Sequence, residues 1–269
     1  MAERAPYPSD LTDEEWACIL PYLPEPAPTG RALEYPLREI ANAIFYLNKS
    51  GCQWRMIPHD LVPWHVAYYH FSKWEDDGTW AAILDALRAR EREEEGRDPK
   101  PSAVVVDSQS VPTRAHGAAR GYDGGKKIWG RKRHLLTDTL GLLVCVLVTA
   151  AGVHDADAAR PLFERAIARG AVARVARVWG DTKYGHKGLP AWVEAHLNGA
   201  QVETKKRPPD AEGFVVIPKR WVVERTNAWS GGARRLSKDY EVAPRHSEAM
   251  IRIAHIRILL KRRRLGYSC

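Results

Sequence analysis

The feature that most constrains this chain is a short apolar run, Ala103–Val106, which leads directly into the carboxylate of Asp107. An unbroken run of small and β-branched residues is typical of a strand that is buried on both faces. Such a strand belongs at the centre of a sheet, so we expect the rest of the fold to be built around it. Burial of a carboxylate is costly unless it is paired or binds a cation. Asp107 therefore either caps a turn together with Ser108 or serves as a ligand, and the strand alone does not choose between these interpretations.

Two further carboxylates favour the ligand interpretation. A second apolar strand is predicted over Val175–Gly180, and it also runs into an aspartate, Asp181. Glu224 lies in a predicted helix that begins near Lys219. Three converging carboxylates repel one another unless a divalent cation lies between them, and hard oxygen ligands suit Mg²⁺ or Mn²⁺. Because paired ions of this kind promote in-line displacement at a phosphodiester, we predict phosphoryl transfer on nucleic acid, with Asp107, Asp181 and Glu224 as catalytic metal ligands.

The predicted helix around Glu224 has two distinct faces. Arg220 and Glu224 share one face with Asn227 and with the position of Gly231, so a cation and a carboxylate point the same way. Three other residues of this helix are expected to face the sheet: Trp221, Val222 and Ala228.

Clustered positive charge indicates a polyanionic partner. The chain contains 41 Lys and Arg against 33 Asp and Glu, which gives a formal net charge of +8 at pH 7. Basic runs occur at 126–133, 205–207 and 261–264. Such clustering favours nucleic acid, although charge runs are also often solvated faces. We expect phosphate contacts from Arg220 and from the first basic run, whose candidates are Lys126, Lys127, Arg131, Lys132 and Arg133.

The N-terminal third is predicted to be all-helical. Thr12 and Glu15 form a capping-box pattern, and further helices are expected after Pro36, after Pro63 and over 79–95. The helices after the two prolines suggest a helix-turn-helix, whose second helix would present to DNA the side chains of His65, Tyr69 and Lys73. An ordinary helical bundle with aromatic residues in its core is the alternative. The charged segment 93–99, which contains a proline, predicts a boundary between a DNA-binding domain, 1–98, and a catalytic domain, 99–269.

The element order beyond this boundary is that of an α/β (α+β) fold with a mixed sheet. A strand is followed by a hairpin of two strands, and then helices and single strands alternate. Several polar residues have a simpler structural explanation. Asp138 lies in the hairpin turn, Asp155 and Asp157 begin a helix, and His134 and His154 lie at strand ends, where a ligand role is the less favoured interpretation.

The cysteines and the hydropathy pattern restrict the compartment. The four cysteines are far apart and form no Cys-x-x-Cys pair, so we expect a reducing compartment and no zinc framework. The sequence shows no apolar signal core, and no apolar run approaches the roughly 20 residues that span a bilayer. We therefore expect a cytoplasmic protein without membrane contact.

Several motifs occur in the order in which one known family carries them. Asp-Ser-Gln-Ser-Val at 107–111 follows the central strand, and a glycine- and lysine-rich signature occupies 121–134. Trp-Val-Val-Glu-Arg-Thr-Asn-Ala-Trp stands at 221–229, with a basic segment at 234–241 after it. The N-terminal matches are at 7–12 and 51–55. On these motifs the chain resembles, over nearly its whole length, the DDE transposases of the insertion sequence 5 family.

The resemblance implies a ribonuclease H-like catalytic domain whose metal-binding triad is Asp107, Asp181 and Glu224. It implies two Mg²⁺ or Mn²⁺ ions, cleavage of double-stranded DNA at the ends of an insertion sequence, and transfer of the freed 3′-hydroxyl to target DNA. A homodimer or larger assembly, associated with the nucleoid, is expected for pairing two ends. Ile217 and Gly231 stand where the family pattern has Tyr and Lys. The alternatives are a nuclease of the same fold without strand transfer and a catalytically decayed DNA-binding copy.

Overall fold

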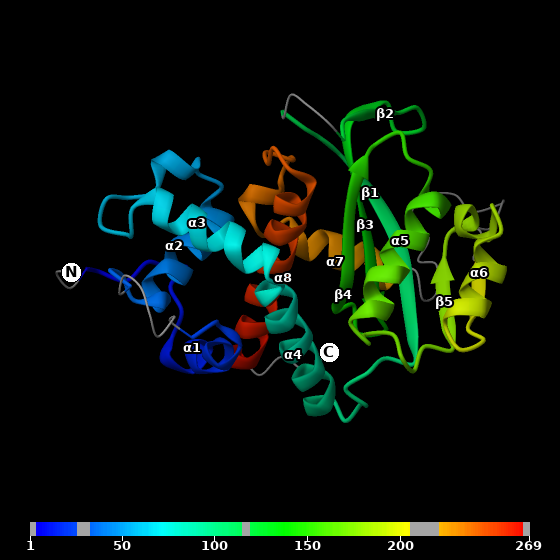
Figure 1. Ribbon diagram of the computed structural model, residues 1–269, viewed down its shortest axis with the longest axis horizontal. Coiled ribbons are helices and arrows are strands. Elements are labelled where there is room, and N and C mark those ends of the chain that lie inside the picture. Colours follow the sequence, from blue (N-terminus) through cyan, green and yellow to red (C-terminus); the bar gives the residue numbers. More distant parts are fainter. Residues whose placement is uncertain (1–3, 26–32, 115–118, 205–220, 266–269) are drawn as a thin grey trace.

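The computed structural model describes residues 4–25, 33–114, 119–204 and 221–265. It consists of a helical N-terminal part, a mixed sheet of six strands and a long C-terminal helix that lies between them (Figure 1). Helices cover both faces of the sheet, so the predicted mixed α/β class is confirmed.

The described residues of the N-terminal part form four α-helices, and local sequence explains where they begin and end. They are α1 (Asp13–Ile19), α2 (Leu37–Ser50), α3 (Trp64–Asp76) and α4 (Thr79–Glu94). The expected capping box is present, because Thr12 and Glu15 exchange hydrogen bonds between side chain and backbone at the start of α1. Gly51 ends α2 in the left-handed conformation, with φ of 76°. A Cβ at this glycine would lie 3.0 Å from the Cβ of Arg234, so the position favours glycine twice over.

The sheet is built around the predicted central strand. Its strands are β1 (Ala103–Pro112), β2 (Gly121–Asp123), β3 (Ile128–Asp138), β4 (Leu143–Ala150), β5 (Arg177–Gly180) and β6 (Gln201–Thr204). The order is β2-β3-β1-β5-β6, with β4 also paired to β3. The strand β1 runs antiparallel to β3 and parallel to β5, so it is hydrogen-bonded on both edges.

The expectation that the central strand ends at Asp107 was wrong. The strand continues to Pro112, because residues 108–112 pair with β3. The glycine- and lysine-rich segment after it contains β2 and the first half of β3, which pair with each other across a short hairpin. The partner of the second half of β1 lies further along the chain, so a local pattern of apolar residues does not reveal it.

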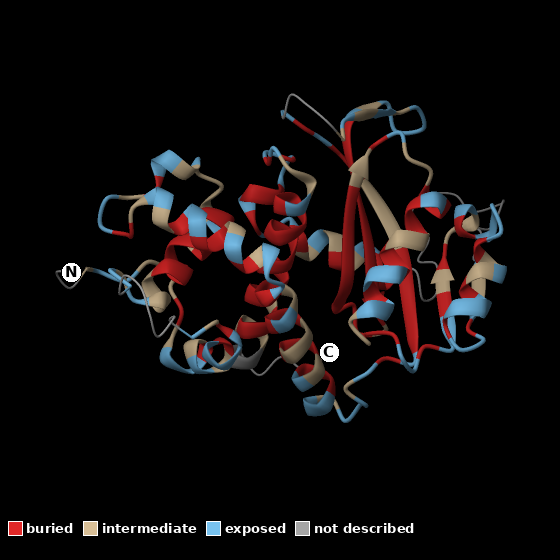
Figure 2. Ribbon diagram, in the orientation of Figure 1, coloured by how far each residue is buried: buried red, intermediate tan, exposed pale blue. Residues whose placement is uncertain are grey.

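The two faces of the sheet pack against different layers. Val104 and Val106 belong to a core with α5 (Asp155–Ala168) and α6 (Leu189–His196), whereas Val105 belongs to a core with the N-terminal helices and α8 (Pro244–Leu265). Figure 2 shows the buried strands between these layers. The second core joins the N-terminal and C-terminal parts, and Asn48 of α2 donates a hydrogen bond to the carbonyl of Met250. Because this core contains side chains from both sides of residues 98 and 99, the domain boundary that we placed there stays a prediction.

The helix that carries Glu224 is α7 (Trp221–Ser230), and a short 3-10 turn, η4 (Arg234–Leu236), follows it. Its assignment of faces needs correction. Trp221 is 39% exposed and Ala228 is also exposed, although both were expected to face the sheet. The buried face is instead formed by Val222, Val223, Thr226 and Ser230. The buried face of α7 is therefore rotated by about one residue from the face that the sequence pattern indicated.

Candidate active site

The first two predicted carboxylates lie side by side. In the parallel pair of β1 and β5, Val105 is opposite Trp179, and Asp107 and Asp181 each lie two residues further along. Val105 and Trp179 pack on the same side of the sheet. Alternate residues of a strand point to opposite faces, and Asp181 continues the extended backbone with φ of −75° and ψ of 176°. The register therefore places both aspartates at one level and on one face.

Asp181 also begins a short 3-10 helix, η3 (Thr182–Gly185), and its Oδ1 accepts a hydrogen bond of 2.9 Å from the backbone N–H of Lys183. The next residue, Tyr184, is buried. Its ring packs so closely on Gly180 that a Cβ there would lie 2.7 Å from a ring atom. Burial raises the pKa of Tyr184 well above its usual value, and the negative charges of Asp107, Asp155 and Asp181 raise it further. The carboxylates of Asp107, Asp155 and Asp181 therefore all lie close enough to act on Tyr184.

The third predicted carboxylate lies on the same side of the sheet but is not gathered with the other two. The helix α7 packs against β1 and β3, and its Val223 shares a core with Val105. Thr226 donates a hydrogen bond of 2.7 Å to the carbonyl of Gly141, which ties the helix to the β3–β4 turn. Glu224 itself is exposed. Among the described residues, no group of three or more His, Cys, Asp and Glu side chains is arranged to hold a metal ion.

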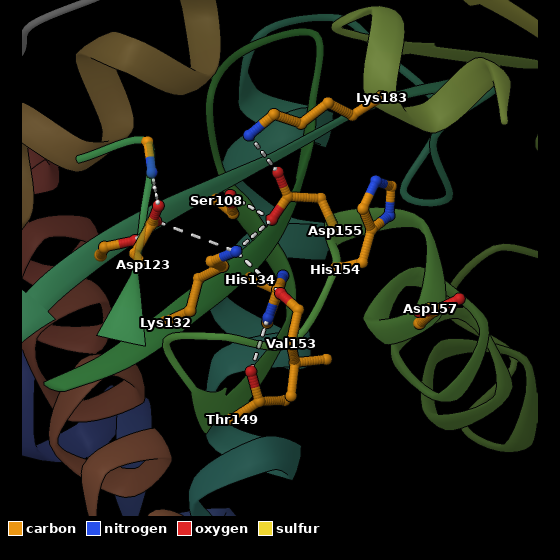
Figure 3. A network of polar contacts seen from close by, with 12 residues as sticks. Ser108, Asp123, Lys132, His134, Thr149, Val153, His154, Asp155, Asp157 and Lys183 are labelled. Carbon is orange, nitrogen blue, oxygen red and sulfur yellow. Dashed lines mark hydrogen bonds and ion pairs between the residues drawn. The ribbon is translucent and has the colours of Figure 1, made fainter. Parts of the chain in front are cut away.

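Sequence reasoning missed a cluster of charges around Asp155, which includes the residue after Asp107 and the second residue after Asp181 (Figure 3). Asp155 is the first residue of α5 and only 2% exposed. Its carboxylate accepts hydrogen bonds of 2.9 Å from Ser108 and Lys183 and forms an ion pair of 2.9 Å with Lys132. Burial alone would raise the pKa of Asp155, but the bonds from the two lysines outweigh burial and lower it to about 2.

The position of Asp155 at a helix start was predicted correctly, and His154 is the N-cap, as its side chain accepts from the backbone N–H of Ala156. The expectation that this aspartate is explained by the helix start alone was wrong. Its partners come from β1, β3 and η3, which lie far apart in the sequence, so no local motif signals the cluster.

The first basic run divides into two parts. Lys126 and Lys127 are exposed on the β2–β3 hairpin. Arg131, Lys132 and Arg133 are between 1% and 5% exposed, and their expected contact with DNA phosphates needs correction. Lys132 is bound to Asp155 and to the carbonyl of Val153.

The two buried arginines hold the chain that follows η4. The guanidinium of Arg131 lies 3.0 Å from Asp239 and donates to the carbonyls of Glu241 and Val242. Arg133 donates to two further carbonyls, those of Leu236 and Lys238. These side chains are part of the protein interior and do not face a partner.

The predicted DNA-contacting residues of the N-terminal part lie together on α3. His65, Tyr69 and Lys73 are all exposed, and their spacing of four residues places them on one face of the helix. The opposite face contributes Phe71 and Trp74 to the core, so the aromatic residues of α3 serve both the core and the surface. Arg220 lies outside the described residues.

Two residues judged structural from the sequence are structural in the fold. Asp138 is fully buried, accepts hydrogen bonds from the backbone N–H groups of Leu140 and Leu142, and forms an ion pair of 2.6 Å with Arg92. His134 is also fully buried, and its Nε2 lies 2.9 Å from the hydroxyl of Thr149.

Comparison with known families identifies the family of the chain. Residues 11–84 match a family model described as a transposase of the IS4/5 family, and residues 98–259 match the transposase DDE domain. No curated protein matches the chain. In the described residues, no helix is long and apolar enough to cross a membrane. The second match covers more than half of the chain and implies the ribonuclease H-like fold that the sheet order shows. The chain therefore belongs to the DDE transposases of the IS4/5 type.

Proposed function

We propose that this transposase cleaves DNA at the ends of an insertion sequence and transfers the freed 3′ ends to target DNA, with Asp107, Asp181 and Glu224 as the catalytic carboxylates. The observation that carries the proposal is the parallel register of β1 and β5, which sets two carboxylates side by side on the face that α7 covers. Action on chromosomal DNA would place the protein in the cytoplasm, at the nucleoid.

The donor set fits a divalent cation. Asp107 and Asp181 offer hard oxygen atoms, and both lie close enough to the buried Tyr184 to add to the rise in its pKa that burial causes. These two residues would hold Mg²⁺ or Mn²⁺, and Glu224 would complete the ligands from α7. When bound, one or two such ions would activate the attacking oxygen and stabilise the charge on the phosphate.

A surface beside this site suits DNA. The hairpin of β2 and β3 presents Tyr122 and Trp129, which are 46% and 58% exposed and lie 5.7 Å apart between ring centroids. Arg120 lies 5.5 Å from the ring centroid of Trp129, and Lys126 and Lys127 follow on the turn. Aromatic rings interleaved with cations bind bases and phosphates together. Lys126 also reaches the carbonyl of Ser108, the residue after Asp107, so the hairpin lies close to the proposed reaction centre.

The N-terminal helices supply the second proposed contact. His65, Tyr69 and Lys73 would bind the terminal inverted repeats, with α3 as the helix that enters the groove. Pairing of two ends would require at least a dimer, because each chain would supply one set of catalytic carboxylates.

The decisive experiment uses the Asp107→Asn variant and an oligonucleotide copy of the element's end with Mg²⁺. We expect cleavage and strand transfer to be abolished while the dissociation constant for the same DNA stays within about twofold of wild type, because the amide cannot supply the ligand charge. Asp157→Asn is the matched control and should keep full activity, because this half-exposed carboxylate lies on α5 and forms an ion pair with Lys187. Retained strand transfer by Asp107→Asn would refute the proposed mechanism.

A second candidate is a decayed copy that binds DNA without cutting it. The observation in its favour is that the described residues contain no cluster of three metal-binding groups, since Glu224 is not gathered with the two aspartates. Wild-type protein that binds the element's end tightly but shows no Mg²⁺- or Mn²⁺-dependent cleavage would establish this function instead. Cleavage without joining would indicate a nuclease of the same fold.

A further inference from the structure

We propose that Asp155 is a positioning residue for the reaction centre, which acts through Lys183 to fix the carboxylate of Asp181. The inference rests on the proposed role of Asp181 as a metal ligand. Asp155 lies on the opposite side of the sheet from the core that contains Val105 and α7, so it is not one of the three proposed ligands.

The orientation of Asp181 depends on a very short element. The backbone N–H of Lys183 donates to Asp181 Oδ1 at 2.9 Å, and this bond exists only while η3 keeps its turn. The element has four residues, and 3-10 turns of this length have poor hydrogen-bond geometry and little stability of their own. The turn therefore needs contacts from the rest of the fold.

Two side chains of η3 supply these contacts. Tyr184 is buried against Gly180 on the side of α5. Lys183 places its Nζ 2.9 Å from Asp155 Oδ2. The Asp155 carboxylate is itself held in place, since Ser108 of β1 and Lys132 of β3 bind its other oxygen (Figure 3). Ser108 directly follows Asp107, so one buried carboxylate connects the strand of the first proposed ligand to the turn of the second.

The two lysines that bind Asp155 differ in their surroundings. The side chain of Lys132 is 7% exposed, whereas that of Lys183 is 51% exposed. Replacing Asp155 would leave the buried ammonium of Lys132 without its closest anion, and the protein would lose stability as a whole. Replacing Lys183 leaves Asp155 bound to Lys132 and Ser108, so Lys183→Met tests positioning without unfolding the domain.

The test measures binding of Mn²⁺ alone by isothermal titration calorimetry, with urea unfolding in parallel. Removal of a nearby positive charge should by itself strengthen the binding of a cation. Loss of a side chain that orients a metal ligand typically weakens binding by about 10–100-fold. We expect Lys183→Met to weaken Mn²⁺ binding about tenfold with little change in unfolding, and Lys183→Arg to restore part of the affinity.

Lys187→Met is the matched control. Lys187 pairs with Asp157 and so links the same two parts of the chain, but this ion pair is half-exposed and does not touch Asp155. It should leave Mn²⁺ affinity unchanged. Binding by Lys183→Met that is as tight as or tighter than wild type would overturn the positioning role. If Asp107→Asn and Asp181→Asn also bound Mn²⁺ as wild type does, the proposed metal site itself would fail, which is a separate outcome.

Discussion

The two ends of one basic segment, 126–127 and 131–133, show how differently the same charge is used in this protein. Lys126 and Lys127 stand on an exposed hairpin turn, whereas Arg131 to Arg133 lie within the fold and are at most 5% exposed. The difference follows from the partners. The buried cations are matched by carboxylates and carbonyls of the same chain, and the exposed ones lie on the turn of the hairpin that also presents Tyr122 and Trp129. A run of positive charge in the sequence therefore contains both structural and DNA-binding candidates.

The largest expected effect on stability comes from a substitution at the buried end of this segment. Arg131→Met leaves Asp239, whose side chain is 1% exposed, without its cation. Removal of one member of a buried pair costs about 3–5 kcal/mol. We expect a loss of this size in the free energy of unfolding, measured by urea denaturation. The double variant with Asp239→Asn should recover part of the loss, and an Arg131→Met protein as stable as wild type would contradict the structural role.

The next effect concerns His134, which directly follows the buried cations. Burial lowers the pKa of His134 to about 4, although the charge of Asp155 acts in the opposite direction. Between about pH 6.5 and pH 4 the unfolded chain would bind a proton that the folded chain does not, so stability should fall as the pH falls through this window. The contribution is on the order of 3 kcal/mol.

We expect the His134→Gln variant to show a shallower loss of stability over this pH window than wild type, as measured by urea unfolding at a series of pH values. His255, whose pKa is also lowered to about 4 by burial, contributes in the same direction, so part of the slope should remain. An unchanged slope in the variant would show that His134 is not excluded from protonation.

The smallest effect on stability is expected from substitutions at the exposed end of the segment, residues 126–127. Lys126→Ala with Lys127→Ala should change the free energy of unfolding by no more than about 0.5 kcal/mol, as is usual for surface positions. The same variant should weaken DNA binding and reduce the slope of log K against log salt concentration by up to about 1.8, since each phosphate contact contributes about 0.9. Fluorescence anisotropy with labelled duplex at several KCl concentrations measures both. An unchanged slope would remove these lysines from the DNA surface.

Much of the fold could be predicted from local patterns. The start of α1 followed from its capping box, and the start of α5 followed from Asp155 and Asp157 in its first turn. The length of β1 could not be predicted, because its second half is polar and owes its strand conformation to pairing with β3. The cluster around Asp155 was missed for the same reason, as its members come from separate elements.

The sequence by itself determined the central strand, several helix starts, the family and the three candidate carboxylates, because capping, apolar runs and motifs depend on residues that are close together in the chain. Only the tertiary structure decided that Asp107 and Asp181 share one level and one face, since this depends on the register of two strands that are far apart in sequence. It also decided which cations are internal, because burial and pairing depend on what the rest of the chain brings alongside. The valines alone indicated the central strand. The position of Asp107 relative to Asp181 depends on the pairing of this strand with β5.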